Sequence, residues 1–419
     1  MLAALITFTT QAVIPPTLNW LWFLAPIWIP LILWEFAWDL WVRYIRIAWI
    51  LSVPKTLVEI RLPQETMKSP AAMELVLNAI HNTADGSNFA QYWKGEMRPQ
   101  YSLELISLAG QVKFLIWLEA RRMDGLMSAL YSQFPGVGVH EVPDYTKDVF
   151  FDPEKLKVFA CEMMFTKDNA YPIKTYVDFG LDKDPKEEFK VDPMTPMLEW
   201  LGSVKADQQV WIQMIVRAHK KDQIKPNHLF KKTDLWKDGA EKLINEIMKR
   251  NPKTKVTGEE DEETGMSKKP TMSPADNDLL DALSRSITKP AFDVGIRAIY
   301  ISPRATFDTP FGIGGIISSF KHFNTEHLNG FKPNGDKWMA QFGDPWKDYK
   351  NIRRNALSSE VLVAYKQRAY FHPPFMSQPL VLNTEELATI YHFPGSVSAT
   401  PGLQRIPSKR ADAPTNLPI

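Results

Sequence analysis

The chain of 419 residues contains a single cysteine and has a net charge of only +1, and both scarcities exclude classes of protein. The lone cysteine, Cys161, cannot form an intramolecular disulfide, which fits a reducing compartment for the soluble part of the chain. It also excludes a cysteine-based zinc site. Lys plus Arg total 49 against 48 Asp plus Glu, so the chain lacks the basic excess of proteins that bind a nucleic-acid backbone. We therefore expect no direct nucleic-acid binding.

Motifs for nucleotide, metal and acid–base chemistry are also missing. No G-x-x-x-x-G-K-[ST] phosphate loop occurs, and the glycine cluster Phe311–Gly315 lacks the third glycine of a dinucleotide turn, so it predicts close helix packing. His322 and His327 are five residues apart, whereas helical zinc ligands are four apart. Glu385 and Glu386 are adjacent and would point about 100° apart on a helix. We predict no catalytic, cofactor-binding or metal-binding residues, and thus no enzyme.

A long apolar stretch lies near the N-terminus. No charged side chain precedes Glu35, and Trp20–Leu33 reads WLWFLAPIWIPLIL. About 20 mostly apolar residues suffice to span a bilayer. The apolar character resumes through Val42, and basic residues begin at Arg43, which places the C-terminal bulk in the cytoplasm by the positive-inside rule. We predict a single-pass anchor in the inner (cytoplasmic) membrane, within residues 1–53. The predicted anchor residues are Trp20, Trp22, Trp28, Trp34, Trp38, Trp41, Arg43 and Arg46.

Two other interpretations of this stretch compete with a membrane span. A cleaved signal peptide is disfavoured because no Lys or Arg opens the chain and no small-residue cleavage site follows. A buried core helix would be unusually rich in tryptophan, since seven of the fourteen tryptophans fall between Trp20 and Trp49. Met1–Val13 is also apolar, so a second, shorter membrane segment stays open. Tyr44–Val53 is compatible with an amphipathic extension along the interface.

The soluble part begins with a βαββαβ pattern over residues 54–150. The predicted elements are a strand Thr56–Leu62, a helix with one apolar face from Met73 to Ile80, a hairpin Tyr101–Leu118, a helix Met123–Phe134 and a strand Val137–Val142. This order is that of the ferredoxin-like split unit.

A second cycle of the same kind is predicted over residues 151–331. Its elements are a strand Ile173–Phe179, a helix after Asp192, strands Gln209–Ala218 and Phe292–Tyr300, and a helix Ile313–Phe320. An insertion at about 221–289 separates its middle strands and holds a charged helix Asp234–Lys249, an acidic linker Asn251–Thr271 and a helix that starts at Ser273. The predicted fold class is therefore α+β, with a transmembrane helix followed by two ferredoxin-like units.

The remainder, residues 332–419, is rich in proline and predicts an extended tail with one short helix, 383–393. Asn383 is placed as its N-cap and Glu386 as the partner three residues on, which is the capping-box arrangement. A helix of about two turns is not stable alone, so its apolar face must pack on another surface.

Six segments carry a resemblance to a known family. They are VEIRLPQETMKSPAAME, YSLELISLAGQVKFLIW, QFPGVGVHEVPDY, QQVWIQMIVRAHKK, FDVGIRAIYIS and VLNTEELATIYHFPG. From about Val58 onward they resemble the membrane-proximal region of a protein family that is found in ultra-small candidate-phylum bacteria. In that family the region precedes an ATPase of the type IV secretion or conjugative coupling class, in the FtsK/HerA superfamily. RIPSKRADAPTNLPI resembles the connector to that ATPase, yet no Walker motif follows.

The resemblance implies a membrane-anchored, non-catalytic platform for a translocation ATPase that moves DNA or protein. The ATPase would be a separate chain or a missing C-terminal domain, and a homo-oligomeric ring is possible. The short helix would pack on the chain's own second unit and also touch the ATPase, with docking residues Leu387, Ile390, Tyr391, Phe393 and Pro394. Two alternatives stay open: an independent membrane adaptor that binds another envelope protein, and a membrane enzyme with an unrecognised site.

Overall fold

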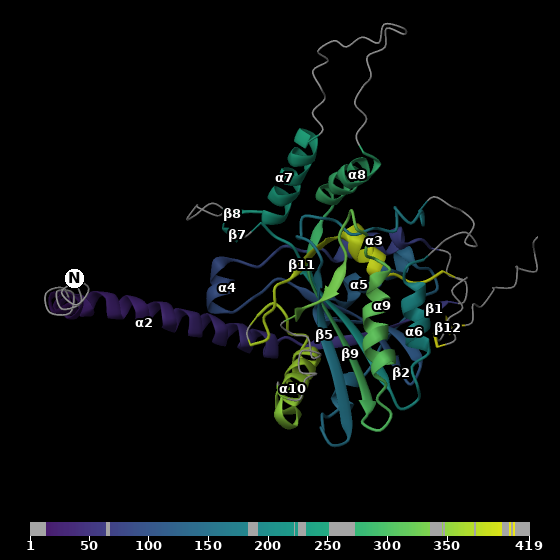
Figure 1. Cartoon of the computed structure of the whole chain (residues 1–419), viewed down its shortest axis with the longest axis horizontal. Coiled ribbons are helices and arrows are strands. Elements are labelled where there is room, and N and C mark those ends of the chain that lie inside the picture. The colour runs from purple at the N-terminus through teal and green to yellow at the C-terminus, as the bar shows by residue number, and fades with distance from the viewer. Residues whose placement is uncertain are drawn as a thin grey trace, which may run out of the picture. The chain divides into compact units, whose positions relative to one another are not determined.

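The apolar N-terminal stretch forms a helix in the computed structural model, α2 (Ile14–Ser52), which contains Pro26 and Pro30 (Figure 1). Its segment Trp22–Ser52 has 31 residues and a mean hydropathy of 1.4, and only 6% of its apolar window is buried. By length and composition the helix is apolar and long enough to cross a membrane. The predicted N-terminal apolar helix is confirmed.

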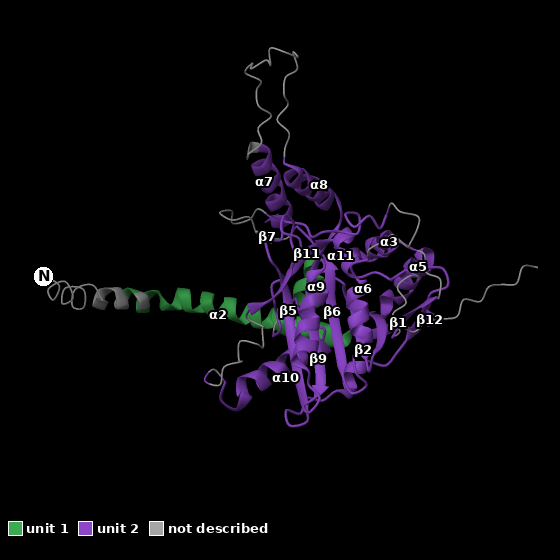
Figure 2. Ribbon diagram, turned by 45° about the vertical axis from the view of Figure 1, so that its right-hand side comes forward, with its two compact units in different colours: residues 1–53, 85–97 green, residues 54–84, 98–419 purple. Residues whose placement is uncertain are grey.

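The structure describes residues 14–63, 68–182, 192–221, 223–224, 232–250, 273–335, 346, 348–372, 374–395, 402–403 and 405–406. They belong to two compact units, unit 1 with residues 1–53 and 85–97 and unit 2 with residues 54–84 and 98–419 (Figure 2). The possible membrane segment Met1–Val13, the acidic linker Asn251–Thr271 and residues 407–419 of the connector lie outside the described residues.

In unit 1 the short helix α4 (Asn88–Trp93) packs on α2. The indole Nε1 of Trp41 donates a hydrogen bond to the carbonyl oxygen of Tyr92 over 3.0 Å. Gly95 has a φ of +74°, and a Cβ there would lie 2.3 Å from the carbonyl oxygen of Ile45. The backbone approaches α2 so closely that only glycine fits at this position.

In the described part of unit 2, ten strands form one sheet. The strands are β1 (Lys55–Pro63), β2 (Gln100–Leu108), β3 (Gln111–Glu119), β4 (Gly138–Glu141), β5 (Leu156–Phe165), β6 (Gln209–Ala218), β9 (Ala291–Pro303), β10 (Phe331–Pro333), β11 (Leu380–Asn383) and β12 (Arg405–Ile406). The helices of unit 2 are α3 (Pro70–Ile80), α5 (Met123–Gln133), α6 (Thr195–Gly202), α7 (Leu235–Arg250), α8 (Pro274–Thr288), α9 (Gly315–Lys321), α10 (Ile352–Lys366) and α11 (Thr384–Ile390). Short helical turns occur at η2 (Ala120–Arg122), η3 (Tyr145–Asp148), η5 (Pro310–Gly314) and η8 (Tyr349–Asn351).

The sheet has the same strand arrangement in its two halves. The order is β10-β5-β9-β6-β2-β3-β1, with β4 also paired to β1. The first half consists of β1, β2, β3 and β4, and the second half consists of β5, β6, β9 and β10. Within each half the fourth strand pairs with the first, the first with the third, and the third with the second, and every pair is antiparallel. The halves meet at the antiparallel pair β2 and β6, whose register runs from Gln100↔Arg217 to Leu108↔Gln209. One hydrophobic cluster extends through both halves, from Leu57 in β1 to Phe331 in β10.

A row of polar side chains crosses the middle of the sheet. Glu104, Gln213, Arg297 and Glu162 are successive cross-strand partners on β2, β6, β9 and β5, so their side chains share one face. Arg297 Nη2 lies 2.7 Å from Glu162 Oε1. Arg368, which follows α10, lies 3.0 Å from Glu104 Oε1, with side chains only 1% and 0% exposed. A buried charge is costly unless it is paired. These contacts therefore favour a single register between β2 and β6, where the two halves of the sheet meet.

The insertion between β6 and β9 contains the two predicted helices, which are confirmed as α7 and α8. Their apolar faces meet at Ala240, Ile247 and Leu283, in a small cluster of their own. The short strands β7 (Gln223–Ile224) and β8 (Lys232–Thr233) pair just before α7.

Two predictions about the elements are wrong. Ile173–Phe179 is a series of turns in which Asp178 accepts a hydrogen bond from the backbone N–H of Thr175, and the strand of this region is β5 instead. β5 lies between β9 and β10 and is almost continuously buried, so it lacks the alternation of a half-exposed strand. The predicted extended tail contains the 15-residue helix α10, and β11 adds to the central strand β9.

Candidate functional site

The C-terminal segment that contains α11 lies in the core of unit 2. β11 pairs with β9, and α11 begins immediately after it. The backbone N–H of Glu386 donates to Asn383 Oδ1 over 2.8 Å, and the backbone N–H of Asn383 donates to Glu386 Oε2 over 2.9 Å. The predicted capping box is confirmed, and it satisfies backbone donors that the first turn of a helix leaves unpaired.

The residues predicted to dock a partner are occupied by this chain. Leu387, Ile390 and Tyr391 are 0% exposed, and Phe393 is 1% exposed. The Tyr391 hydroxyl donates to the carbonyl oxygen of Leu115 over 3.2 Å. The ring of Phe393 lies 4.8 Å from that of Phe134, and Pro394 is also buried. The predicted docking role for these side chains is wrong, because α11 buries them against α3 and the sheet and leaves no face for a second protein.

His392 has a structural explanation that needs no metal. Its ring nitrogens lie 2.9 Å from the carbonyl oxygen of Ala388 and 3.1 Å from Asp192 Oδ2. Although burial disfavours the charged imidazole, the Asp192 carboxylate raises the pKa of His392 above its usual value. The pair attaches the region before α6 to the end of α11.

The acidic side chains of α11 belong to a buried ionic cluster. Lys289 Nζ lies 2.7 Å from both Glu74 Oε1 and Glu385 Oε2. The Thr175 hydroxyl donates to Glu385, and the Tyr176 hydroxyl donates to Glu74 over 2.6 Å. These contacts connect α3, α11 and the end of α8 to the loop that contains Thr175.

Glu386 makes a second contact with the same loop. Its Oε1 accepts a hydrogen bond from the backbone N–H of Ile173 over 2.8 Å. Complete burial raises the pKa of the Glu386 carboxyl to about 8, although the N–H groups of Asn383 and Ile173 act in the opposite direction. A carboxyl held in this way positions the loop and has no access to a substrate.

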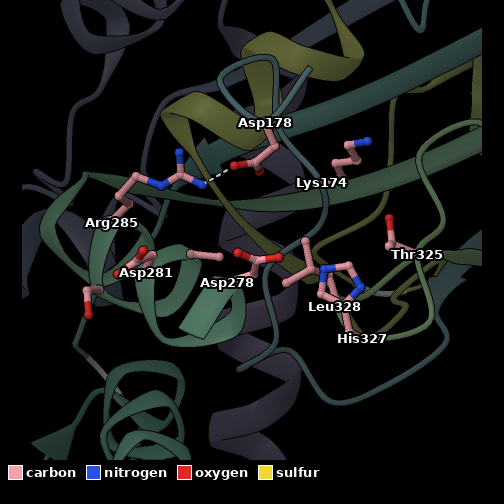
Figure 3. Close-up of a pocket in the computed structure, with 10 residues that line it drawn as sticks. Lys174, Asp178, Asp278, Asp281, Arg285, Thr325, His327 and Leu328 are labelled. Carbon is pink, nitrogen blue, oxygen red and sulfur yellow. Dashed lines mark hydrogen bonds and ion pairs between the residues drawn. The ribbon is translucent and has the colours of Figure 1, made fainter. Parts of the chain in front are cut away.

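A cavity of about 630 Å³ lies beside this cluster, between α8, the Ile173–Phe179 loop and the segment before β10 (Figure 3). Asp178 and Arg285 form an ion pair at its wall. Its other ionisable residues are Lys174, Asp278, Asp281 and His327. In the described part of the chain the imidazole of His327 makes no hydrogen bond to a hydroxyl or carboxylate, so the lining lacks the base–nucleophile pair that covalent catalysis requires. The mixture of charges suits a small polar ligand.

Another cluster of charged side chains surrounds His219 and holds the start of the insertion between β6 and β9. His219 Nδ1 lies 2.6 Å from Asp293 Oδ1 on β9, and Nε2 lies 3.2 Å from Asp234 Oδ1. Burial lowers the pKa of the imidazole, but hydrogen bonds to Asp234 and Asp293 outweigh it and raise the pKa of His219 to about 9. Asp234 also accepts from the backbone N–H of Lys237, and so caps α7.

The remaining candidates for chemistry have structural roles. No group of three or more His, Cys, Asp or Glu residues suited to a metal occurs within the described ranges. Cys161 is buried, and burial raises the pKa of its thiol to about 12. A Cβ at Gly312 would lie 2.0 Å from the ring of Tyr300, and one at Gly315 would lie 1.9 Å from Trp200 Nε1. The prediction that the glycine cluster serves close packing is confirmed.

The predicted anchor residues lie on α2 and are mostly exposed. Trp20, Trp22 and Trp34 are between 64% and 75% exposed, Trp28 and Trp41 are each 38% exposed, and Trp38 and Arg46 are partly covered. Arg43 forms an ion pair with Asp39 over 2.7 Å. Exposed tryptophans on an apolar helix are unfavourable in water and typical of a membrane interface.

Comparison with protein families identifies a family to which most of the chain is similar. A family model described as a domain of unknown function, DUF8128, matches residues 51–404 and thus most of the chain. No curated protein matches the sequence.

Proposed function

The chain belongs to the DUF8128 family, and we propose that it is a membrane-anchored, non-catalytic adaptor. The observation that carries the proposal is the exposure of α2. Within the described part of unit 1, α4 covers only one portion of this apolar helix, and 6% of the apolar window is buried, so most of it is not shielded from water. A bilayer supplies that environment.

The adaptor is a single-pass protein of the inner membrane with its bulk in the cytoplasm. Arg43, Arg46 and Lys55 follow the apolar part of α2, and no basic residue precedes it. This asymmetry supports the orientation through the positive-inside rule.

A non-catalytic role is supported by the way the buried ionisable groups are used. Glu385 is paired with Lys289, His219 with two aspartates, and Glu104 with Arg368. Catalytic acids and bases must reach a substrate, whereas these groups are covered by the chain itself. We further infer that each half of the sheet is a ferredoxin-like unit, from its order of strands and helices.

The partner that we propose is a translocation ATPase of the FtsK/HerA superfamily, on the basis of the sequence resemblance. The second candidate is an independent adaptor for another envelope protein. Because α11 is buried, the partner surface in either case lies elsewhere on unit 2, and a ring of several copies would present it repeatedly.

Crosslinking in intact cells tests this proposal. The full-length chain is crosslinked, purified from membranes and searched for covalently attached proteins by mass spectrometry. The ATPase hypothesis expects an FtsK/HerA-type ATPase as the dominant attached protein. It also expects this ATPase to leave the membrane fraction when the gene for the chain is deleted. Attachment of a different envelope protein, with the ATPase unaffected by the deletion, would favour the second candidate.

A further inference from the structure

A second cavity, of about 340 Å³, lies at the end of the sheet where β5 begins and β9 ends, beside the start of α10. Leu156 and Pro303 are partners at this end of the β5–β9 pair, and α10 contacts β5 (Figure 1). Four cationic side chains line the cavity: Lys157, Arg304, Lys350 and Arg354. We refer to this cavity with its four cations as the basic groove.

Among the described residues, the side chains that line the basic groove carry positive charge only. No acidic side chain lines it, and in the described ranges none of its four cations forms an ion pair. Elsewhere in unit 2 buried or half-buried cations such as Lys289 and Arg368 are paired with carboxylates. Lys157 Nζ instead lies 4.1 Å from the ring centroid of Phe307. Burial, together with the positive charges of Arg354 and Arg304, lowers the pKa of Lys157.

The backbone holds these cations in place. The backbone N–H of Arg304 donates to the carbonyl oxygen of Lys155 over 2.9 Å, and its Nη1 donates to that of Pro153 over 3.0 Å. Lys350 and the next residue have φ values of 54° and 59°, which non-glycine residues rarely adopt. The Asp348 carboxylate accepts the backbone N–H of Arg354 over 2.8 Å at the start of α10. Cations gathered on fixed backbone are preorganised for an anion.

Exposed apolar side chains neighbour residues of the basic groove in the sequence. Phe150, Tyr349 and Ile352 are exposed, and each is adjacent in the sequence to a residue that lines the groove. Exposed aromatic and aliphatic side chains beside Lys and Arg are typical of surfaces that contact the interface of an anionic membrane. A groove for single-stranded nucleic acid would also combine cations with aromatics, but the neutral balance of the whole chain does not favour it.

We propose that the basic groove binds the phosphate group of an anionic phospholipid, with Phe150, Tyr349 and Ile352 in contact with the membrane interface. This inference rests on the proposed membrane anchoring, which brings unit 2 to a lipid surface. Arg304 and Arg354 can each donate two hydrogen bonds to phosphate oxygens, while the lysines supply point charges.

Calorimetric titration of the full-length chain in a neutral detergent tests the proposal without membrane insertion. The ligands are dihexanoyl-phosphatidylglycerol, dihexanoyl-phosphatidylcholine, inorganic phosphate and a single-stranded oligonucleotide of about 12 nucleotides. The test variant is Lys157→Gln with Arg354→Gln. The matched control, Lys242→Gln with Lys321→Gln, removes the same charge from exposed positions outside the groove. If the test variant melts below the parent, Arg304→Gln with Lys350→Gln replaces it, since both side chains are exposed.

We expect the parent chain to bind phosphatidylglycerol at least about tenfold more tightly than phosphatidylcholine. The affinity of the test variant for phosphatidylglycerol should fall about thirtyfold, while that of the control variant should stay unchanged. Equal affinity for the two lipids, or equal losses in the two variants, would overturn the proposal. If inorganic phosphate bound as tightly as phosphatidylglycerol, the ligand of the groove would be free phosphate, and the lipid assignment would be overturned. Tighter, groove-dependent binding of the oligonucleotide would replace the lipid with nucleic acid. Each result is independent of whether an ATPase is the partner.

Discussion

The burial of α11 makes a quantitative prediction for Ile390→Ala. Ile390 is 0% exposed, and the substitution removes three carbon atoms from its side chain. At about 0.8 kcal/mol for each carbon, lost transfer free energy amounts to about 2.4 kcal/mol. A cavity of about 60 Å³ adds about 1.5 kcal/mol. We expect the free energy of unfolding to fall by about 4 kcal/mol in total.

The matched control for this substitution is Ile352→Ala, because Ile352 is 63% exposed at the start of α10. Its free energy of unfolding should change by no more than about 0.5 kcal/mol. Thermal unfolding of the full-length chain in detergent, followed by circular dichroism, measures both variants. The Ile390→Ala protein should melt about 5 °C below the parent, because the entropy of unfolding grows with the size of the unit. If the two variants melted at the same temperature, Ile390 would not be a core residue, and a docking role for the α11 face would be restored.

Two further predictions concern His219 and the glycines at α9. The pKa of His219 is about 9 in the folded chain against an ordinary value of 6.5 for histidine, so the protonated imidazole stabilises the fold fully below pH 6.5. That contribution, about 3 kcal/mol, should be lost as the pH rises through 9, and a melting curve that is equally flat with pH in the parent and in His219→Gln would contradict it. Gly315→Ala should lower the melting temperature because its Cβ would overlap Trp200, whereas Gly314→Ala, with no atom within 4 Å of its Cβ, should not. Equal melting of the two glycine variants would show that this packing is looser than described.

Local signals in the sequence predicted the local structure well. The capping box at Asn383 depends on two residues three positions apart, and it forms as expected. The hairpin of β2 and β3 is also confirmed, because alternating apolar residues flank Ala109–Gly110. α10 could have been found by counting Ser358 with Val361, Leu362 and Tyr365, which are buried at helical spacing.

The partner of each apolar face could not be predicted from local signals. The α11 face had to pack somewhere, but whether on its own core or on another chain depends on contacts such as that between Tyr391 and Leu115, 276 residues apart. The ion pair of Glu104 with Arg368 joins residues 264 positions apart and has no local signature. The basic groove was missed for the same reason, since its cations come from β5, the residue after β9, η8 and the start of α10.

Labelling of single cysteines in intact cells tests the membrane anchor most directly. Cys161 is the only cysteine, so a Cys161→Ala chain accepts one new thiol at a time. Ala3→Cys, before the apolar stretch, should react with a membrane-impermeant maleimide in intact cells. Lys321→Cys, exposed at the end of α9, should react only after lysis. Labelling of both positions in intact cells, of neither, or of Lys321→Cys alone would contradict a single-pass anchor with a cytoplasmic bulk.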